Sequence, residues 1–380
     1  MIPHRALAID FSPIPIVERQ RGLRAAIGDM NPKKLRGAVI GYGFVSANGH
    51  IPAYLKRKHS MGDVDIVAIA DICPVRRNLA RDALPGARIY SGYQDMLNAE
   101  SANLDFVDIS TPPSDHAAIA DAALANGFHV LCEKPLACTE EEARSLLERA
   151  KTVQRVIFPC HNYKHAPGVR AIREIIQSGR IGKVRLVTLN IYRNTHAKGV
   201  TDWNSDWRRQ SRYSGGGIAM DHGSHSFYLT FDWLGSYPTS VKAKMSNLEA
   251  GKYDTEDDFT AELTFPTGLA RVHLTWTAGV RKVIYTVEGE KGTITLEDDD
   301  LAIEAMNGSP VRHVEKKSLN SDWNDASHTS WFNSLFDEFQ AAIERKDFAG
   351  KEAQDAIRCV QLINTAYRSA QQGSRELPLT

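Results

Sequence analysis

Two patterns of apolar and polar residues divide this chain near its middle. From Leu35 to about Pro159, short apolar runs typical of buried strands alternate with stretches in which apolar residues recur at helical spacing. This alternation predicts βαβ units that build a doubly wound parallel sheet. The six predicted strands span residues 38–40, 64–70, 87–90, 105–110, 128–132 and 156–159.

After about residue 160, strands follow one another with few helices between them. Turns at 266–268 and 290–292 join neighbouring strands directly, and a direct turn requires antiparallel pairing. We expect an α+β part with an open, mostly antiparallel sheet, whose uncovered surface could form a subunit interface. The expected strands span 184–193, 240–246, 258–265, 269–277, 283–288 and 293–297, and the expected helices 168–178, 330–345 and 351–372. The last two helices should return to brace the first domain.

These patterns predict three segments. They are an N-terminal arm at 1–34, a dinucleotide-binding domain at 35–160, and a domain for substrate binding and oligomerisation at 161–380. In the arm, prolines favour an extended backbone over 11–16, and 17–29 could form a short basic helix. The arm is either an unordered leader or a segment that packs on the chain or on a neighbouring subunit.

Composition excludes several classes of function. Lys plus Arg equals Asp plus Glu, at 46 each in 380 residues, so no net field attracts nucleic acid or an anionic membrane. No apolar run approaches the roughly 20 residues of a membrane span. The five cysteines are scattered without CxxC spacing, which indicates a reducing compartment without structural disulfides or a zinc knuckle. We expect a cytoplasmic protein.

A glycine turn after the first strand is the strongest local motif. Gly41-Tyr42-Gly43 precedes a helical stretch, so the first glycine can make a tight turn and the second can let a pyrophosphate approach the backbone. The third position of G-x-G-x-x-G is Ser46, where Gly or Ala is usual. A glycine pair of this kind also serves ordinary turns, so the motif needs a second signal.

Asp71 supplies that second signal at the end of the second strand. A carboxylate there can accept a hydrogen bond from a ribose 2′-hydroxyl and repels a 2′-phosphate, which favours NAD over NADP. The long spacing from the glycines is attributed to an inserted loop at 56–63. Two alternatives stay open: Arg76 and Arg77 could face a 2′-phosphate, or Asp71 could be a simple turn residue.

Lys134 lies between Glu133 and Pro135 at the end of a buried strand, where desolvation disfavours its charge. In the functional interpretation its ammonium faces a substrate hydroxyl and stabilises negative charge on that oxygen as a hydride leaves. In the structural interpretation Glu133 neutralises it.

A second cluster follows the triple glycine at 215–217, which predicts a pliant loop. Asp221 and His225 are spaced i, i+4 and so share a helix face. The imidazole could accept a proton near neutral pH while the carboxylate orients it. Alternatively, His222 could join them as metal ligands, with Cys160-His161 nearby, or His225 could be a packed core residue.

Together these motifs resemble the glucose–fructose oxidoreductase and inositol dehydrogenase (Gfo/Idh/MocA) family. The matching elements, in order, are GYG at 41–43, Asp71, STPP at 110–113, EKP at 133–135, Trp207-Arg208, and GGG-x3-DHGSH at 215–225. The resemblance implies a Rossmann domain, an open-sheet domain that often mediates dimers or tetramers, and oxidation or reduction of a sugar or cyclitol carbon with NAD(H) or NADP(H). It also implies that Lys134, Asp221 and His225 are the catalytic residues.

The same resemblance suggests which residues bind each ligand. Cofactor contacts are expected from Gly41, Tyr42, Gly43, Phe44, Val45, Asp71, Thr111, Pro112, His116, Glu133, Lys134, Asn162, Trp207 and Arg208. Substrate contacts are expected from Lys134, Tyr163, Lys164, Asp221, His225 and Tyr228.

Two positions depart from the family pattern. Tyr228 stands where many members carry an aspartate, and Lys164 stands where an arginine is frequent. The sequence therefore predicts an NAD-dependent dehydrogenase, without a metal, that oxidises a ring hydroxyl of a sugar, a cyclitol or a nucleotide-linked sugar such as a UDP-N-acetylhexosamine. Alternatives are an NADPH-dependent keto-sugar reductase and a non-catalytic NAD(H)-binding sensor. The protein is expected to form a homo-oligomer, a dimer or tetramer.

Overall fold

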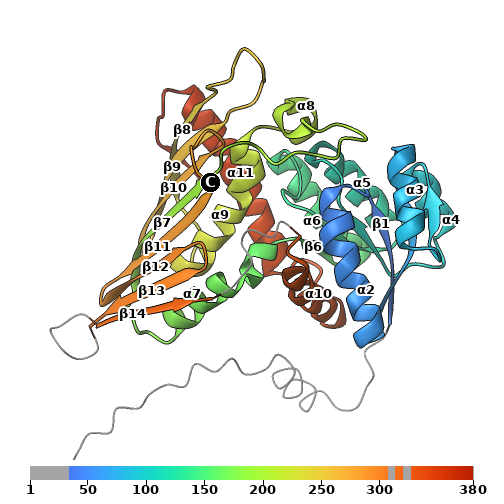
Figure 1. Ribbon diagram of the computed structural model, residues 1–380, viewed down its shortest axis with the longest axis horizontal. Helices are drawn as coiled ribbons and strands as arrows, with labels where there is room; N and C mark the ends of the chain where they lie inside the picture. The colour runs from blue at the N-terminus through green and yellow to red at the C-terminus, as the bar shows by residue number, and fades with distance from the viewer. Residues whose placement is uncertain (1–33, 307–312, 320–326, 380) are drawn as a thin grey trace, which may run out of the picture. The chain divides into compact units, whose positions relative to one another are not determined.

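Six parallel strands form the first sheet of the computed structural model, which describes residues 34–306, 313–319 and 327–379. Their order is β3-β2-β1-β4-β5-β6, so the strand order reverses between β1 and β4 (Figure 1). A ligand binds such a sheet in the crevice beyond the carboxyl ends of its strands, at this reversal. The strands are β1 (Leu35–Ile40), β2 (Val64–Ala70), β3 (Arg88–Tyr90), β4 (Phe106–Ile109), β5 (His129–Cys132) and β6 (Ile157–Pro159). The predicted doubly wound parallel sheet is confirmed.

Helices connect these strands as predicted. They are α2 (Ile51–Ser60), α3 (Pro74–Ala83), α4 (Tyr93–Ala99), α5 (Pro113–Ala125) and α6 (Glu140–Val153). A capping box between Thr139 and Glu142 begins α6. The inserted loop expected at 56–63 is wrong, because α2 continues to Ser60. Buried Arg57 stabilises its last turn by ion pairs with Asp63 and Asp337.

Nine strands form the second sheet, in the order β14-β13-β12-β11-β7-β10-β9-β8-β15. They are β7 (Val184–Tyr192), β8 (Ser240–Ser246), β9 (Asp258–Phe265), β10 (Gly268–Thr275), β11 (Lys282–Gly289), β12 (Gly292–Glu297), β13 (Asp300–Ala305), β14 (His313–Ser318) and β15 (Leu377–Pro378). Both tight turns join antiparallel neighbours, and the one parallel pair among the described strands of this second sheet is β7 with β10. The mostly antiparallel sheet is confirmed, although the sequence patterns missed β13, β14 and β15.

Helices pack on one side of this sheet and link it to the first sheet (Figure 1). The remaining long helices are α7 (Pro167–Gln177), α9 (Ile218–Leu234), α10 (Thr329–Glu344) and α11 (Lys351–Gln371). α9 contacts β7, β9 and β10, and α11 contacts β8, whereas α10 also packs on α2 and α11 on α6. The rings of Phe336 and Phe339 of α10 pack tilted or edge-on against Phe106 of β4, so α10 belongs to the apolar core on one face of the parallel sheet.

The predictions for the N-terminal arm, including the extended 11–16 and the helix at 17–29, lie outside the described residues. In the described part of the chain, no helix combines the length and the apolar character that crossing a membrane requires.

Candidate active site

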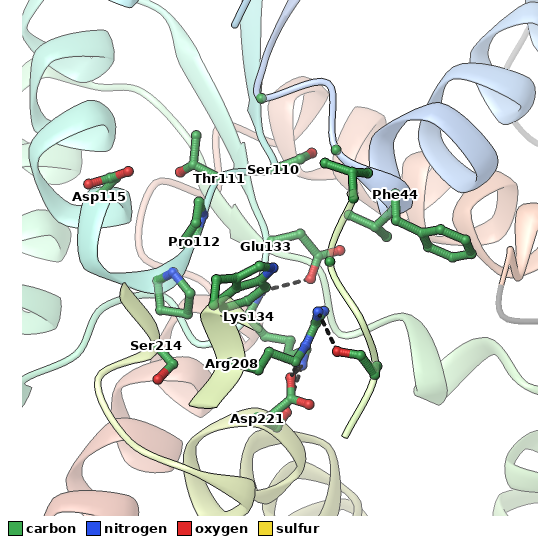
Figure 2. Close-up of a pocket in the computed structure, with 18 of the residues that line it drawn as sticks. Phe44, Ser110, Thr111, Pro112, Asp115, Glu133, Lys134, Arg208, Ser214 and Asp221 are labelled. Carbon is green, nitrogen blue, oxygen red and sulfur yellow. Dashed lines mark hydrogen bonds and ion pairs between the residues drawn. The ribbon is translucent and has the colours of Figure 1, made fainter. Parts of the chain in front are cut away.

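A cavity of about 940 Å³ lies beyond the carboxyl ends of the parallel strands. One side is lined by residues that follow β1, β2, β4 and β5, and the facing side by α9 and by the segment after β7. Figure 2 shows how side chains from both halves of the chain meet across it. The strand-end positions expected from the sequence therefore surround one common space.

The glycine turn fits the approach of a ligand backbone. Gly41 has φ +90°, and a Cβ there would lie 2.8 Å from the carbonyl oxygen of Ser110, so a side chain would be strained. A Cβ on Gly43 would meet nothing within 4 Å, which leaves open space next to the turn. Helical backbone begins directly behind, with the π-helical turn Ser46–His50 that continues into α2. These features suit the pyrophosphate of a dinucleotide.

Asp71 is both a turn residue and a lining residue of the cavity. Its Oδ1 accepts a hydrogen bond from the Cys73 amide and its Oδ2 from the Tyr42 amide, both at 2.7 Å. Arg76 donates to the Tyr42 carbonyl and pairs with Asp202, and Arg77 donates to the carbonyls of residues 71 and 72. Both guanidinium groups are therefore engaged within the chain, although Arg76, like Asp71, lines the cavity at this end.

The middle of the cavity offers polar atoms that suit a bound ligand. The Thr111 hydroxyl is buried and has no hydrogen-bond partner among the described residues, although Thr111 lines the cavity. Glu133 also lines it, and its Oε1 accepts a hydrogen bond of 3.2 Å from His50 Nε2. Burial favours the neutral acid, but His50 outweighs burial and lowers the pKa of Glu133. Glu133 is therefore ionised at neutral pH.

His50 is a buried cation that bridges two carboxylates. Its Nδ1 donates to Asp108 at 2.7 Å and its Nε2 to Glu133. Burial opposes the charge, but Asp108 and Glu133 together raise the pKa of His50 to about 10. His50, Glu133 and Cys160 also lie close enough to hold a metal ion. His50 and the two carboxylates form a charge network, in which each ring nitrogen of His50 contacts a carboxylate.

Lys134 pairs with a carboxylate from the opposite side of the cavity. Its Nζ donates to the Asp221 carbonyl at 2.6 Å and to Asp221 Oδ1 at 3.1 Å, as Figure 2 shows. The alternative in which Glu133 neutralises Lys134 is wrong, because Glu133 contacts the Lys134 backbone amide and His50 instead. Arg208 reaches the same Asp221 oxygen at 3.4 Å. Burial would raise the pKa of Asp221, but these two cations lower it well below its ordinary value.

His225 is held by Tyr228 rather than by Asp221. Its Nδ1 lies 2.7 Å from the Tyr228 hydroxyl, which also accepts a hydrogen bond from the Tyr163 amide at 3.2 Å. The His225 ring stacks on the Tyr163 ring at 3.9 Å. Its Nε2 has no hydrogen bond with the described residues, and His225 lines the cavity. Burial, and the nearby charge of Lys134, lower the pKa of His225 well below 6.5, so the ring is neutral at pH 7.

His222, the third member of the alternative metal set, lies beside this pair. Burial lowers the pKa of His222 to about 3, although Asp221 is close, with Nε2 3.7 Å from its carboxylate. Asp221, His222 and His225 do not form a potential metal-binding group among the described residues.

The triple glycine permits close packing rather than a pliant loop. A Cβ on Gly216 would lie 2.0 Å from the Tyr367 hydroxyl, and one on Gly217 would lie 1.9 Å from the Glu256 carbonyl oxygen. The Glu256 carboxylate accepts hydrogen bonds of 2.9 Å from the amides of Gly217 and Ala219. It thereby caps the first turn of α9, which carries Asp221 and His225. The sequence patterns missed Glu256, because its role depends on a loop far along the chain.

Most residues expected at the ligand sites do line the cavity. They are Gly41, Gly43, Phe44, Val45, Asp71, Thr111, Pro112, Glu133, Lys134, Asn162, Tyr163, Trp207, Arg208, Asp221 and His225. Tyr42 and His116 do not: Tyr42 packs in the apolar core, and His116 is buried between the carbonyls of Pro135 and Thr111. Their expected side-chain contacts with a cofactor are therefore corrected.

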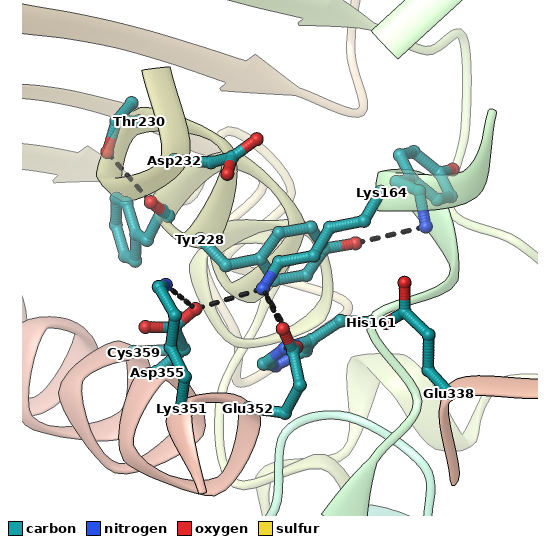
Figure 3. A network of polar contacts seen from close by, with 12 residues as sticks. His161, Lys164, Tyr228, Thr230, Asp232, Glu338, Lys351, Glu352, Asp355 and Cys359 are labelled. Atoms are coloured by element: carbon teal, nitrogen blue, oxygen red, sulfur yellow. Dashed lines mark hydrogen bonds and ion pairs between the residues drawn. The ribbon is translucent and has the colours of Figure 1, made fainter. Parts of the chain in front are cut away.

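Lys164 and Tyr228 are not lining residues either, which corrects their assignment to the substrate. Both belong to the network of polar contacts in Figure 3. The Lys164 ammonium donates to both oxygens of Glu352, at 2.7 and 2.8 Å, and to Asp355 at 2.9 Å. It also lies over the Tyr228 ring, 5.5 Å from the centroid. The reason is topological, because α11 brings its two carboxylates to a lysine that sequence alone places near the site.

The sequence patterns did not identify several lining residues, because no motif marks them and they are distinguished only by lying next to the end of a strand. Arg193 follows β7, Trp276 follows β10 and Arg281 precedes β11. Other lining residues, Trp203 and His328, come from segments without any motif.

The chain matches known families over most of its described length. Residues 35–161 match an oxidoreductase family described as an NAD-binding Rossmann fold, and residues 169–295 match the GFO/IDH/MocA C-terminal domain. An inositol 2-dehydrogenase of Rhizobium meliloti (strain 1021) is 26% identical over 87% of this chain and 96% of that protein. A 1,5-anhydro-D-fructose reductase of Ensifer adhaerens is 30% identical over 50% of this chain and 56% of that protein.

A solved structure of similar fold is a levoglucosan dehydrogenase in complex with NADH. It superposes with a TM-score of 0.79, over 92% of this chain and all of that one, at 21% sequence identity. At this identity the superposition shows a common fold and no more.

Proposed function

Since the chain belongs to the Gfo/Idh/MocA family of NAD-binding oxidoreductases, we propose that it oxidises a ring hydroxyl of a sugar or cyclitol with NAD⁺. The observation that carries this proposal is the meeting of an ammonium, Lys134, and a neutral imidazole, His225, in one cavity. Such a pair can hold an alcohol oxygen and take its proton. A sensor without turnover would have no use for it.

Residues on the parallel-sheet side of the cavity fit the cofactor. The open space at Gly43 and the helix behind it suit the pyrophosphate, and Asp71 suits the ribose hydroxyls. The unpartnered Thr111 hydroxyl and ionised Glu133 supply polar atoms near Lys134. When bound, NAD⁺ supplies the acceptor for the hydride that leaves the substrate carbon.

A side chain of the protein, not the cofactor, accepts the proton of the substrate hydroxyl. With its Nδ1–H donating to the Tyr228 oxygen, His225 keeps a lone pair on Nε2 for the substrate proton. Lys134 holds the same substrate oxygen and stabilises the negative charge that grows on it. Asp221 fixes the ammonium in place without neutralising the whole site, since Arg208 shares that carboxylate.

The proposal also covers the size of the substrate and the association of the protein with copies of itself. The cavity volume of about 940 Å³ also admits a nucleotide-linked sugar beside the cofactor. A homo-oligomer could use the face of the nine-stranded sheet that lies opposite α9 and α11.

The test is oxidation of a panel of sugars, cyclitols and UDP-sugars with NAD⁺, followed by the absorbance of the reduced nicotinamide. We expect turnover with at least one class and loss of that turnover in His225→Asn. Titration of apo protein should show NAD⁺ binding tighter than NADP⁺; equal or tighter NADP⁺ binding would indicate that Arg76 or Arg77 governs the site. Tight NAD⁺ binding without turnover on any compound would favour the sensor.

A further inference from the structure

One segment reaches from the second sheet to the parallel-sheet side of the cavity. It follows β7 and covers residues 194–208, of which residues 194–200, Trp203, Trp207 and Arg208 line the cavity. The segment ends next to Arg209, whose buried guanidinium pairs with buried Asp257 at 3.1 Å, directly before β9. This end is therefore fixed to the second sheet. The middle of the segment contacts the first sheet's side through Asp202.

Asp202 contacts the stretch that links β2 to α3. Its carbonyl accepts a hydrogen bond from the Cys73 thiol at 3.4 Å, and its Oδ2 lies 3.3 Å from Arg76 Nη1. The Arg76 side chain is 11% exposed and that of Asp202 33%, so the ion pair is partly shielded from water. Asp202 is the one carboxylate that forms an ion pair with Arg76 in the part of the chain that the structure describes.

Arg76 and Asp71 bind the same residue of the glycine turn. The Tyr42 amide donates to Asp71 at 2.7 Å, and the Tyr42 carbonyl accepts from Arg76 Nε at 2.7 Å. A carboxylate and a guanidinium thus lie at the two ends of one residue, and both line the cavity. Since Asp71 suits a ribose 2′-hydroxyl, a cation in this position is near enough to attract a phosphate on the same ribose.

A guanidinium without a carboxylate partner would favour NADP here. NADP differs from NAD only by its 2′-phosphate, which an arginine binds through paired, charge-assisted hydrogen bonds. The two candidate arginines are both engaged. Arg77 donates to the carbonyls of Asp71 and Ile72, and Arg76 pairs with Asp202. A 2′-phosphate at Arg76 would have to displace one carboxylate while another, Asp71, repels it.

We propose that Asp202 is a specificity-determining residue, which pairs with Arg76 and so prevents that arginine from binding a 2′-phosphate. The inference rests on the preference for NAD in the proposed function and explains part of it. Asp71 repels the phosphate directly, whereas Asp202 occupies the cation that would attract it. Cofactor choice then depends on a contact between the two halves of the chain, since Asp202 comes from the segment after β7 and Arg76 from α3.

The experiment measures binding, not turnover. Full-length protein freed of cofactor is titrated with NAD⁺ and with NADP⁺ by calorimetry, and the ratio of the two Kd values is compared between wild type and Asp202→Asn. Asparagine keeps the size of the side chain and removes its charge. We expect the preference for NAD⁺ to fall roughly tenfold, through tighter NADP⁺ binding, while the Kd for NAD⁺ changes less than about threefold. The gain in NADP⁺ affinity should shrink as salt is added.

A double variant identifies the cation that binds the phosphate. In Asp202→Asn with Arg76→Gln the gain in NADP⁺ affinity should disappear, whereas Arg76→Gln alone should leave the ratio near that of wild type. Arg76 also holds the Tyr42 carbonyl, so Asp202→Glu provides a second test if the double variant does not fold. Asp202→Glu keeps the carboxylate and should keep the wild-type ratio.

Asp82→Asn is the matched control. Asp82 is an exposed residue of α3 outside the cavity lining, so this variant removes the same charge from the helix that carries Arg76. The ratio should not change. A gain in NADP⁺ affinity as large as that of Asp202→Asn would mean that net charge, not the ion pair, governs the ratio, and would overturn the inference.

The remaining outcomes separate this inference from the proposed function. An unchanged ratio in Asp202→Asn, or a gain that persists without Arg76, would overturn the inference and leave Asp71 as the source of the NAD preference. Wild-type protein that binds NADP⁺ as tightly as NAD⁺ would contradict that preference and the inference with it. Failure to find an oxidised alcohol would count against the proposed dehydrogenase alone, because these titrations need no substrate.

Discussion

Lys134, which is half-buried, and Lys164, which is buried, both lie beside carboxylates, yet their surroundings give them different roles. Lys134 lines the cavity, and its one ion-pair partner among the residues that the structure describes, Asp221, is shared with Arg208. Lys164 pairs with Glu352 and Asp355 and is not a lining residue. An ammonium has three donors. Lys164 uses them on carboxylate oxygens within the protein, whereas Lys134 faces a space that a substrate can enter.

The comparison shows that burial of a charge does not by itself indicate function. In the Lys164 network, burial opposes the charge of the lysine, but the two carboxylates outweigh burial and raise its pKa. Lys164 in turn lowers the pKa of Glu352 and of Asp355 against the effect of burial. These three groups stabilise one another, and no ligand is needed to complete the set.

The largest effect is expected from Lys134→Met. Turnover should fall roughly 100- to 1,000-fold, because the ammonium acts on the substrate oxygen as its charge develops. Binding of NADH should be nearly unchanged. The measurement is kcat per folded molecule, with folding followed by thermal unfolding. A variant that lost stability but kept normal turnover would place Lys134 in the same structural class as Lys164.

Lys164→Met should have the opposite profile. Removing the cation leaves Glu352 with His161, and Asp355 with Lys351, as its remaining basic partner, at a cost of up to about 3 kcal/mol in the free energy of unfolding. Turnover per folded molecule should change much less than in Lys134→Met. Denaturant unfolding measures the first quantity, and steady-state kinetics measures the second.

Acid should reduce the stability difference between wild type and Lys164→Met. The pKa values of Glu352 and Asp355 are lowered in the folded state, so their stabilisation is present above their unfolded values and disappears as the pH falls through the folded ones. The difference should be constant from neutral pH to about 5 and shrink below about 4. A difference that grew with acid would mean that the carboxylates are not the partners that matter.

Tyr228→Phe probes the residue that connects the two lysine sites. Its ring lies under Lys164, and its hydroxyl holds His225. Loss of the hydroxyl should lower kcat roughly tenfold, since the imidazole is no longer oriented. The ring contact with Lys164 remains, so the loss of stability should be limited to that of the hydrogen bond from the Tyr163 amide. A purely structural role for Tyr228 would lower stability and leave the pH profile as it was.

The pH profile itself should show the neutral His225. Because the pKa of His225 is lowered, wild-type kcat/KM should stay level as the pH falls through about 6.5, the ordinary value of an imidazole, and fall only well below it, as the imidazole gains a proton. His225→Asn should remove that acidic limb, and Tyr228→Phe should move it. A wild-type limb centred at or above pH 6.5 would contradict a buried, neutral base.

The smallest effect is expected from chelation of metal ions, which should leave activity unchanged. The carboxylates nearest to the site already have protein cations as partners: His50 for Glu133, Lys134 and Arg208 for Asp221. Activity lost in EDTA and restored by a divalent ion would instead favour a metal at His50, Glu133 and Cys160.

The local pattern of apolar and polar residues predicted most of the secondary structure and the sheet types. Apolar runs separated by helical spacing predicted all six strands of the parallel sheet, since a strand buried on both faces has to be apolar wherever it lies. The edge strand β14 was missed because its six residues, His313–Ser318, are all exposed and show no alternation. The longer helix α2 was missed because Arg57 is anchored by a residue 280 positions away.

The sequence by itself determined the residue types of the site: the glycine turn, Asp71, Lys134, Asp221 and His225, whose spacing reflects local backbone and helix geometry. Only the tertiary structure decided which partner each charge has. In the folded chain His225 is hydrogen-bonded to Tyr228, and Lys164 forms ion pairs with carboxylates of α11. Arg193 and Arg281 lie at the adjacent ends of two paired strands. The physical reason is that a charge interacts over a few ångströms of space with whatever lies there. Distance along the chain places no limit on that partner.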